Sequence, residues 1–289
     1  MRIRATVAAV SGALALSALA VPAAQADGTA VPNLHKPTAA DVFGITANKA
    51  PRASARAASA LPVISKVVVN GGKDITVGTT AAKKFTVSVT ASHASGVSDA
   101  YVDLWHGTNV DNDIDGLLMP NEDVASCKSS NATTATCTLT ITAYPGDDLY
   151  KNALAGTWHV SAGALAADQS AVAYTDFYST ARVQRVSRIT VNAAPEPVKK
   201  GKTITVTGKL SRANWEDFAY HGYAGQPVKL QFRKKTSSTY STVKTIKTNS
   251  TGALKTTVTA SVDGYWRYSF AGTSTTPTVT AAGDFVDVK

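Results

Sequence analysis

Four carboxylate side chains near the middle of the sequence fall at the spacing of a calcium-binding loop. Residues 111–122 read DNDIDGLLMPNE, which fits the pattern D-x-D-x-D-G-x5-E. Calcium prefers roughly six to eight hard oxygen ligands, and Gly116 falls where such loops turn sharply. The predicted Ca²⁺ ligands are four side chains and one main-chain carbonyl: Asp111, Asp113, Asp115, Leu117 and Glu122.

The segments on either side of this motif do not favour the helices of an EF-hand. Residues 99–110 (DAYVDLWHGTNV) indicate a strand and a turn, and residues 123–131 (DVASCKSSN) show no helical periodicity. Pro120 also falls where the second helix would begin. A calcium loop between strands therefore competes with a loop that is simply solvated, since Asp, Asn and Gly favour turns. Repulsion between the carboxylates favours a cation.

Other catalytic and metal-binding motifs are missing from the sequence. The five histidines have no H-x-x-x-H spacing, and no H-E-x-x-H, G-x-S-x-G or glycine-rich phosphate loop occurs. We therefore expect no enzymatic activity. Glu216 and Asp217 lie among aromatic residues in the segment 212–225. This segment either grips a sugar or packs on its own domain.

The only two cysteines, Cys127 and Cys137, are predicted to form a disulfide, because the chain carries an export signal. That signal occupies residues 1–26, in which Arg2 and Arg4 precede an apolar run that ends at an A-x-A cleavage site. A membrane anchor is the alternative interpretation of this run. We expect a protein that is secreted, extracellular or cell-wall associated.

Basic residues concentrate in the carboxy-terminal part of the chain. Residues 61–185 contain 8 Lys and Arg against 12 Asp and Glu, whereas residues 186–289 contain 15 against 6. The basic residues form two clusters, Lys199–Lys202 and Arg233–Lys235, without interleaved aromatic residues. This pattern argues against nucleic acid, which aromatic side chains bind by stacking. It favours anionic cell-wall polymers or polysaccharide as partners.

The rest of the chain divides into a linker and two β domains. Residues 27–60 are rich in Ala, Pro and Ser and are predicted to be a disordered linker or pro-segment. Short alternating segments separated by turn residues predict a β-sandwich over residues 61–185, with an acidic insertion loop at about 107–131. The same pattern predicts a second, basic sandwich over residues 186–289. Trp158 and Trp266 follow equivalent glycine turns and are expected to anchor the two cores.

Residues 222–273 contain G-x-P-V-x-L-Q-x-R, a middle hairpin and D-G-x-W-R. This stretch resembles the Ig-like domains of secreted actinobacterial proteins, some of which are labelled calcium-binding or cell-surface by similarity. The resemblance implies an immunoglobulin-like sandwich and no particular reaction. The expected fold is thus all-β, with two consecutive Ig-like antiparallel sandwiches.

We expect a non-catalytic extracellular binding or structural protein, stabilised by calcium if the acidic loop binds it. The rival hypothesis is a secreted protease inhibitor or carbohydrate-active protein that acts through a surface loop, such as the disulfide-tethered segment 123–140.

The calcium hypothesis predicts that calcium raises the melting temperature of residues 61–289. Calorimetric titration should detect binding that the Asp113→Ala, Asp115→Ala double variant loses, because two ligand carboxylates are removed. If millimolar calcium produces no heat of binding and no shift in the melting temperature, the metal-site hypothesis is rejected.

Overall fold

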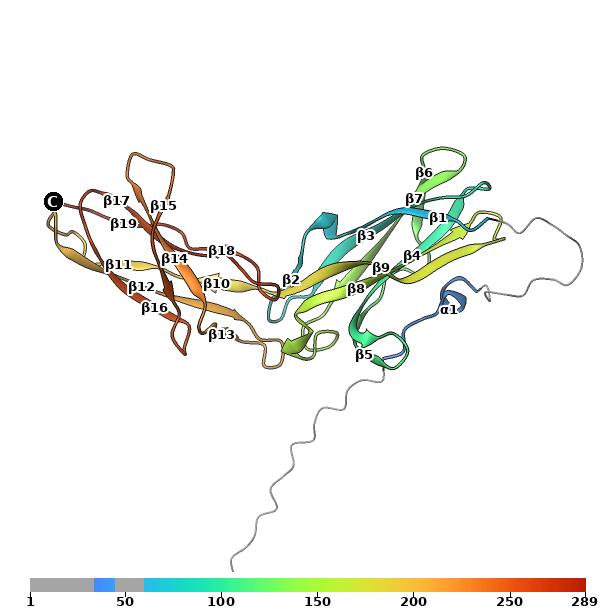
Figure 1. Ribbon diagram of the computed structural model, residues 1–289, viewed down its shortest axis with the longest axis horizontal. Helices are drawn as coiled ribbons and strands as arrows, with labels where there is room; N and C mark the ends of the chain where they lie inside the picture. The colour runs from blue at the N-terminus through green and yellow to red at the C-terminus, as the bar shows by residue number, and fades with distance from the viewer. Residues whose placement is uncertain (1–33, 45–59) are drawn as a thin grey trace, which may run out of the picture. The chain divides into compact units, whose positions relative to one another are not determined.

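The computed structural model describes residues 34–44 and 60–289. Figure 1 labels the α-helix and the strands. Apart from α1 (Ala39–Phe43) and two short 3₁₀ turns (Asn70–Gly72 and Asn152–Leu154), they are strands. The first nine are β1 (Val63–Val69), β2 (Ile75–Val77), β3 (Lys83–Ser92), β4 (Val97–Asn109), β5 (Asp113–Leu118), β6 (Ser126–Ser129), β7 (Thr134–Ala143), β8 (Gly156–Ala166) and β9 (Val172–Arg185). The others are β10 (Ser187–Ile189), β11 (Asn192–Ala194), β12 (Thr203–Ala213), β13 (Tyr220–Gly222), β14 (Pro227–Lys234), β15 (Ser241–Lys247), β16 (Ala253–Thr259), β17 (Gly264–Phe270), β18 (Val279–Thr280) and β19 (Asp284–Val286).

Strands β1–β9 form two sheets, which we call the amino-terminal sandwich. The sheet orders are β1-β3-β7-β6 and β2-β9-β8-β4-β5. Alternate residues of each strand enter the core, as Phe85, Val87 and Val89 of β3 do. All pairs of named strands in the described residues are antiparallel except β2 with β9. The predicted core residue Trp158 is fully buried, and its indole N–H donates to the Leu154 carbonyl at 2.7 Å.

Strands β10–β19 form a second pair of sheets, the carboxy-terminal sandwich. In one sheet β12 pairs with β10, β11, β13 and β16, and in the other β14 and β17 pair with each other and with β15, β18 and β19. The buried side chains include Trp266, as predicted, and Tyr268, whose hydroxyl donates to the Val206 carbonyl at 2.9 Å. The predicted all-β, antiparallel fold is confirmed. The division into two domains stays a prediction, although the sandwiches have separate apolar cores.

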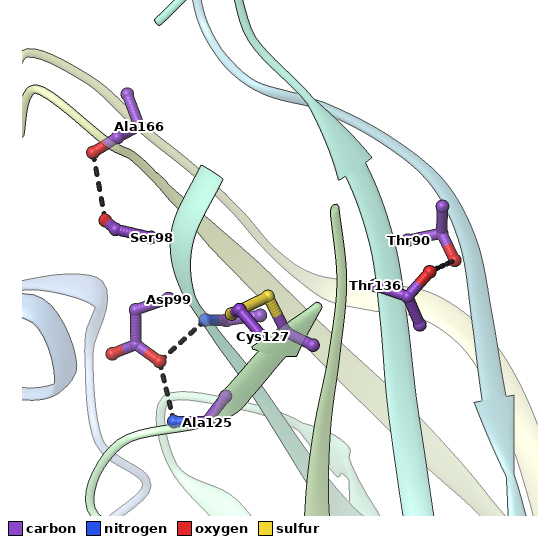
Figure 2. The surroundings of a disulfide bond; sticks show 9 residues. Thr90, Ser98, Asp99, Ala125, Cys127, Thr136 and Ala166 are labelled. Carbon is purple, nitrogen blue, oxygen red and sulfur yellow. Dashed lines mark hydrogen bonds between the residues drawn. A yellow bond between two sulfur atoms is a disulfide. The ribbon is translucent and has the colours of Figure 1, made fainter. Parts of the chain in front are cut away.

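The segment 107–131 is not a single acidic insertion loop, because it contains β5 and β6. Strand β5 extends the sheet of β4, and Leu118 reaches the core. The predicted disulfide is confirmed: Cys127 and Cys137 face each other across β6 and β7 and are bonded (Figure 2). The Asp99 side chain accepts the main-chain N–H of Ala125 at 2.8 Å, which fixes the entry to β6 (Figure 2).

Residues 34–44 lie in the segment predicted to be a disordered linker or pro-segment, and they form an ordered segment that we call the strap. A capping box between Thr38 and Asp41 stabilises the single turn of α1. Lys36 is buried against β4 and β9, far away in the sequence, so local periodicity carries no sign of this docking. The predicted signal peptide and residues 27–33 and 45–59 of the predicted linker or pro-segment lie outside the described residues. No helix in the described part of the chain is long and apolar enough to cross a membrane.

The loop between β12 and β13 joins the two sandwiches. Trp215 is fully buried in the amino-terminal core, and its indole N–H donates to the Val77 carbonyl at 3.4 Å. The Glu216 carboxylate accepts the N–H of Asn152 at 2.8 Å. This aromatic and acidic segment therefore packs on the neighbouring sandwich, which neither of our two interpretations of it foresaw. Arg185, at the end of β9, donates to the Ala213 carbonyl at 2.5 Å.

Replacing Trp215 with alanine should lower the free energy of unfolding by about 3–5 kcal/mol, because a buried indole leaves a cavity. Urea unfolding followed by far-UV circular dichroism measures this loss. Phe218→Ala, in the same loop but 49% exposed, is the control and should cost about 1 kcal/mol or less. Equal losses for the two variants would show that the Trp215 contact does not stabilise the amino-terminal core.

Candidate functional site

The outer face of the sheet that contains β14 and β17 combines basic and aromatic side chains. In β17, Trp266 and Tyr268 point into the core, so Tyr265 and Arg267 lie on the opposite face. Strand pairing places Tyr265 opposite Arg233 of β14 and opposite Phe285 of β19. The sheet register therefore gathers residues from three strands on one surface.

Three of these side chains, Arg267, Arg233 and Tyr265, form a continuous stack with Tyr240 from the loop between β14 and β15. We call this stack the arginine–tyrosine row. The Arg267 guanidinium lies 3.7 Å from the centre of the Tyr240 ring, and that of Arg233 lies 3.8 Å from the Tyr265 ring. Arg233 also approaches Tyr240 at 5.3 Å. Attraction between a cation and an aromatic ring stabilises such stacks, and arginine contributes through its planar group. The row therefore holds both guanidinium groups in fixed planes.

The positive charges of the row have no acidic partner in the part of the chain that the structure describes. Neither Arg233 nor Arg267 forms an ion pair within the described ranges. Each donates one hydrogen bond at 2.8 Å, Arg233 to the Ser237 carbonyl and Arg267 to the Gln231 side chain. A guanidinium has five N–H donors in a fixed fork, so several donors of each arginine remain available to an oxyanion.

The sequence identified only part of this surface. The predicted basic cluster Arg233–Lys235 contributes Arg233 to the row, and Lys235 adds a contact to the Phe285 ring at 5.3 Å. The other cluster, Lys199–Lys202, lies in the turn before β12, and β12 belongs to the other sheet of this sandwich. The basic cluster Arg233–Lys235 contains no aromatic residue, but in the structure the rings of Tyr240 and Tyr265 lie beside Arg233. The alternation Tyr265–Trp266–Arg267 in the sequence was the available signal.

The residues predicted to bind calcium lie on and after the β4–β5 hairpin, where most have protein partners. The Asp115 carboxylate contacts His106 Nδ1 at 2.5 Å and Lys151 Nζ at 2.9 Å. Burial alone would raise the pKa of Asp115, but the bonds from His106 and Lys151 bring it below its usual value. Leu117 pairs with Trp105 in the ladder between β4 and β5.

The other predicted ligands point to separate partners. Asp113 accepts a hydrogen bond from the Thr108 hydroxyl, and Asp111 donates its main-chain N–H to Asn109 at 2.9 Å. Glu122 accepts bonds from the hydroxyl and main-chain N–H of Thr140, which lower the pKa of Glu122. Within residues 34–44 and 60–289, no three His, Cys, Asp or Glu side chains are grouped to hold a metal ion. Calcium binding stays a prediction for the titration above.

Comparisons with known proteins give a family match over part of the chain. Residues 74–164 match the model of a family described as a family of unknown function, DUF5707. No curated protein matches the chain. Similar solved structures include fibronectin(III)-like modules of Clostridium thermocellum CbhA, at 12% identity and a TM-score of 0.35, covering 77% of this chain and 93% of that one. A marsupial T cell receptor has 11% identity and a TM-score of 0.36, covering 78% and 72%. The D00-D0 domain of Intimin has 15% identity and a TM-score of 0.26, covering 76% and 99%.

Proposed function

We propose that this chain is a non-catalytic, exported binding protein whose arginine–tyrosine row binds an anionic cell-wall polymer or acidic polysaccharide. One observation carries the proposal: two stacked guanidinium groups, 3.7 and 3.8 Å from tyrosine rings, share one sheet face, and no carboxylate of the described residues pairs with either. Export rests on the predicted signal peptide.

Stacking favours binding because it restricts the arginine side chains before a ligand arrives. A free arginine side chain loses up to about 2 kcal/mol of rotamer entropy when it is fixed. A guanidinium already held over a ring loses less, and its N–H edge can pair with two oxygens of a phosphate, sulfate or carboxylate group. Repeating anionic groups along a polymer can then engage Arg233 and Arg267 together.

Charge along this face extends beyond the row and suits a long ligand. Lys229 and Lys247 are exposed on β14 and β15, and the pairing of β14 with β17 places Lys229 and Arg233 on the same side of the sheet. Residues 186–289 carry 15 basic against 6 acidic side chains. The resulting positive potential accelerates association with a polyanion and weakens as salt is added.

The same stacking favours a polymer recognised by charge over a single-stranded nucleic acid. Nucleic-acid binding without sequence preference depends on open aromatic faces on which bases stack. Tyr240 is approached by both Arg233 and Arg267, and Tyr265 is covered by Arg233. Arginine side chains of the protein therefore already occupy ring faces on which a base would stack.

The proposal predicts that the protein binds dextran sulfate, a sulfated polysaccharide, in preference to neutral dextran. The Arg233→Ala, Arg267→Ala double variant should bind dextran sulfate at least about tenfold more weakly, a loss of about 1.4 kcal/mol. Calorimetric titration at several salt concentrations measures the affinity and its ionic-strength dependence.

The matched control removes the same charge from the other sheet. Lys209 of β12 and Lys255 of β16 are exposed, so the Lys209→Ala, Lys255→Ala double variant should bind within about threefold of the original protein, since only diffuse charge is lost. The Arg233→Lys, Arg267→Lys variant keeps the charge but loses the planar stack, and should bind with intermediate affinity. Equal weakening in the two alanine variants would reject the row as the site. If single-stranded DNA binds more tightly than dextran sulfate and displaces it, the proposed polysaccharide ligand is wrong and nucleic acid is the ligand.

A further inference from the structure

The strap places a lysine inside a polar cluster on the outer face of the amino-terminal sandwich. In β4, Val102 and Leu104 enter the core, so Asp103 lies on the opposite face, which the strap covers. Phe43 of the strap packs close to Gly163 of β8, where an added Cβ would lie 2.7 Å from the Phe43 ring. The Tyr174 hydroxyl of β9 donates to the strap carbonyl of Pro37 at 3.1 Å. These contacts leave Lys36 only 6% exposed.

Asp103 is a carboxyl group in a position that is fully shielded from solvent, where a charge is unfavourable. It is 0% exposed, and among the described residues neither of its carboxyl oxygens has a hydrogen-bond partner. Lys36 Nζ lies 3.2 Å from Asp103 Oδ2, but the contact lacks the angles of a hydrogen bond. A buried carboxylate without hydrogen bonds is costly, and a nearby cation compensates it only with good geometry. A simple ion pair therefore does not account well for this arrangement.

A second carboxylate completes the cluster. Asp176 of β9 accepts a hydrogen bond from Lys36 Nζ at 2.6 Å, and its side chain is 33% exposed. The ammonium group thus lies between one solvated carboxylate and one fully buried carboxyl group. Tyr174 accepts a further bond from Lys36.

We propose that Lys36 and Asp103 react with each other to form an amide bond between Lys36 Nζ and Asp103 Cγ, with Asp176 transferring the protons. The proposal is independent of the binding function assigned to the arginine–tyrosine row. It makes the strap a covalently attached part of the amino-terminal sandwich.

The reaction is a condensation that needs no oxidant, reductant or cofactor. Asp176, as carboxylate, takes one proton from the Lys36 ammonium, and the nitrogen lone pair attacks Cγ of the protonated Asp103 side chain. A C–N bond forms, and the carbon–oxygen bond to the hydroxyl group breaks. The hydroxyl leaves as water with a proton returned by Asp176, and the nitrogen gives its extra proton back to Asp176. The products are a neutral amide, one water molecule and a protonated Asp176.

The electrostatics of the cluster suit these roles. Burial raises the pKa of the Asp103 carboxyl group, despite the opposing charge of Lys36, and so favours the neutral acid that a nucleophile can attack. Burial lowers the pKa of Lys36, but its acidic and hydroxyl partners outweigh this and raise it, so the amine forms only when a partner takes a proton. Asp176, in contact with Nζ, is positioned for that step. Holding the two groups together replaces a bimolecular encounter by an intramolecular reaction.

The direct test is the intact mass of the full chain, expressed, folded and then denatured. With the Cys127–Cys137 disulfide reduced, the protein should be lighter than its sequence by one water molecule, and a reduced tryptic digest should contain a branched peptide that joins the Lys36 and Asp103 segments. The Asp103→Asn variant should lose one ammonia molecule instead, because the leaving group changes from hydroxyl to amine.

Three controls separate this bond from other dehydrations. Lys36→Arg keeps the positive charge but should show the full mass, whereas cyclisation of an aspartate with its own main chain would not depend on Lys36. Asp176→Asn keeps the shape of the cluster, and the proton transfer should be lost, so most of that protein should remain unlinked. Circular dichroism verifies that both variants fold. The full mass in the folded original protein, or a mass loss that persists in Lys36→Arg, would overturn the proposal.

Discussion

The strict alternation of side chains along each strand is the constraint on which the rest of this structure depends. One face of every sheet is committed to an apolar core, so the chemistry of the molecule is confined to the outer faces. In β17 the alternation sends Trp266 and Tyr268 inward and Arg267 outward, and in β4 it sends Leu104 inward and Asp103 outward. The two outer faces differ in what covers them. The strap covers Asp103 on the outer face of the sheet that contains β4, whereas the charges of the arginine–tyrosine row stay uncovered on the outer face of the sheet that contains β17.

The sequence predicted the strands well wherever alternation and turn residues agree. Phe85, Val87 and Val89 identify β3, and the glycine turns before Trp158 and Trp266 locate both core anchors. Strand β5 was not predicted, because aspartates at every second position fit a calcium-binding loop and also fit a strand whose alternate residues face solvent. Residue type alone does not decide whether its two aspartates, Asp113 and Asp115, are metal ligands.

The features that sequence reasoning missed depend on contacts between distant residues. Lys36 meets Asp103 and Asp176 only after β4 and β9 are paired with β8, so nothing near Lys36 in the sequence marks it as buried. Tyr240 joins the row from the loop between β14 and β15. Trp215, in a segment that looks like an exposed aromatic loop, completes a core built from other strands. Local patterns determine which face a residue takes, and tertiary structure determines what meets it there.

The position of Trp215 has a consequence for how such a chain can evolve. Only Val186 separates β9 from β10, and the indole that fills the amino-terminal core is encoded after that junction. A gene that ended at the junction would produce a sandwich with a hole in its interior, and a gene that began there would expose a tryptophan to water. Recombination at the junction between β9 and β10 would therefore destabilise the amino-terminal product and expose an apolar side chain in the carboxy-terminal product. The two sandwiches are expected to be inherited as a pair rather than exchanged as separate modules.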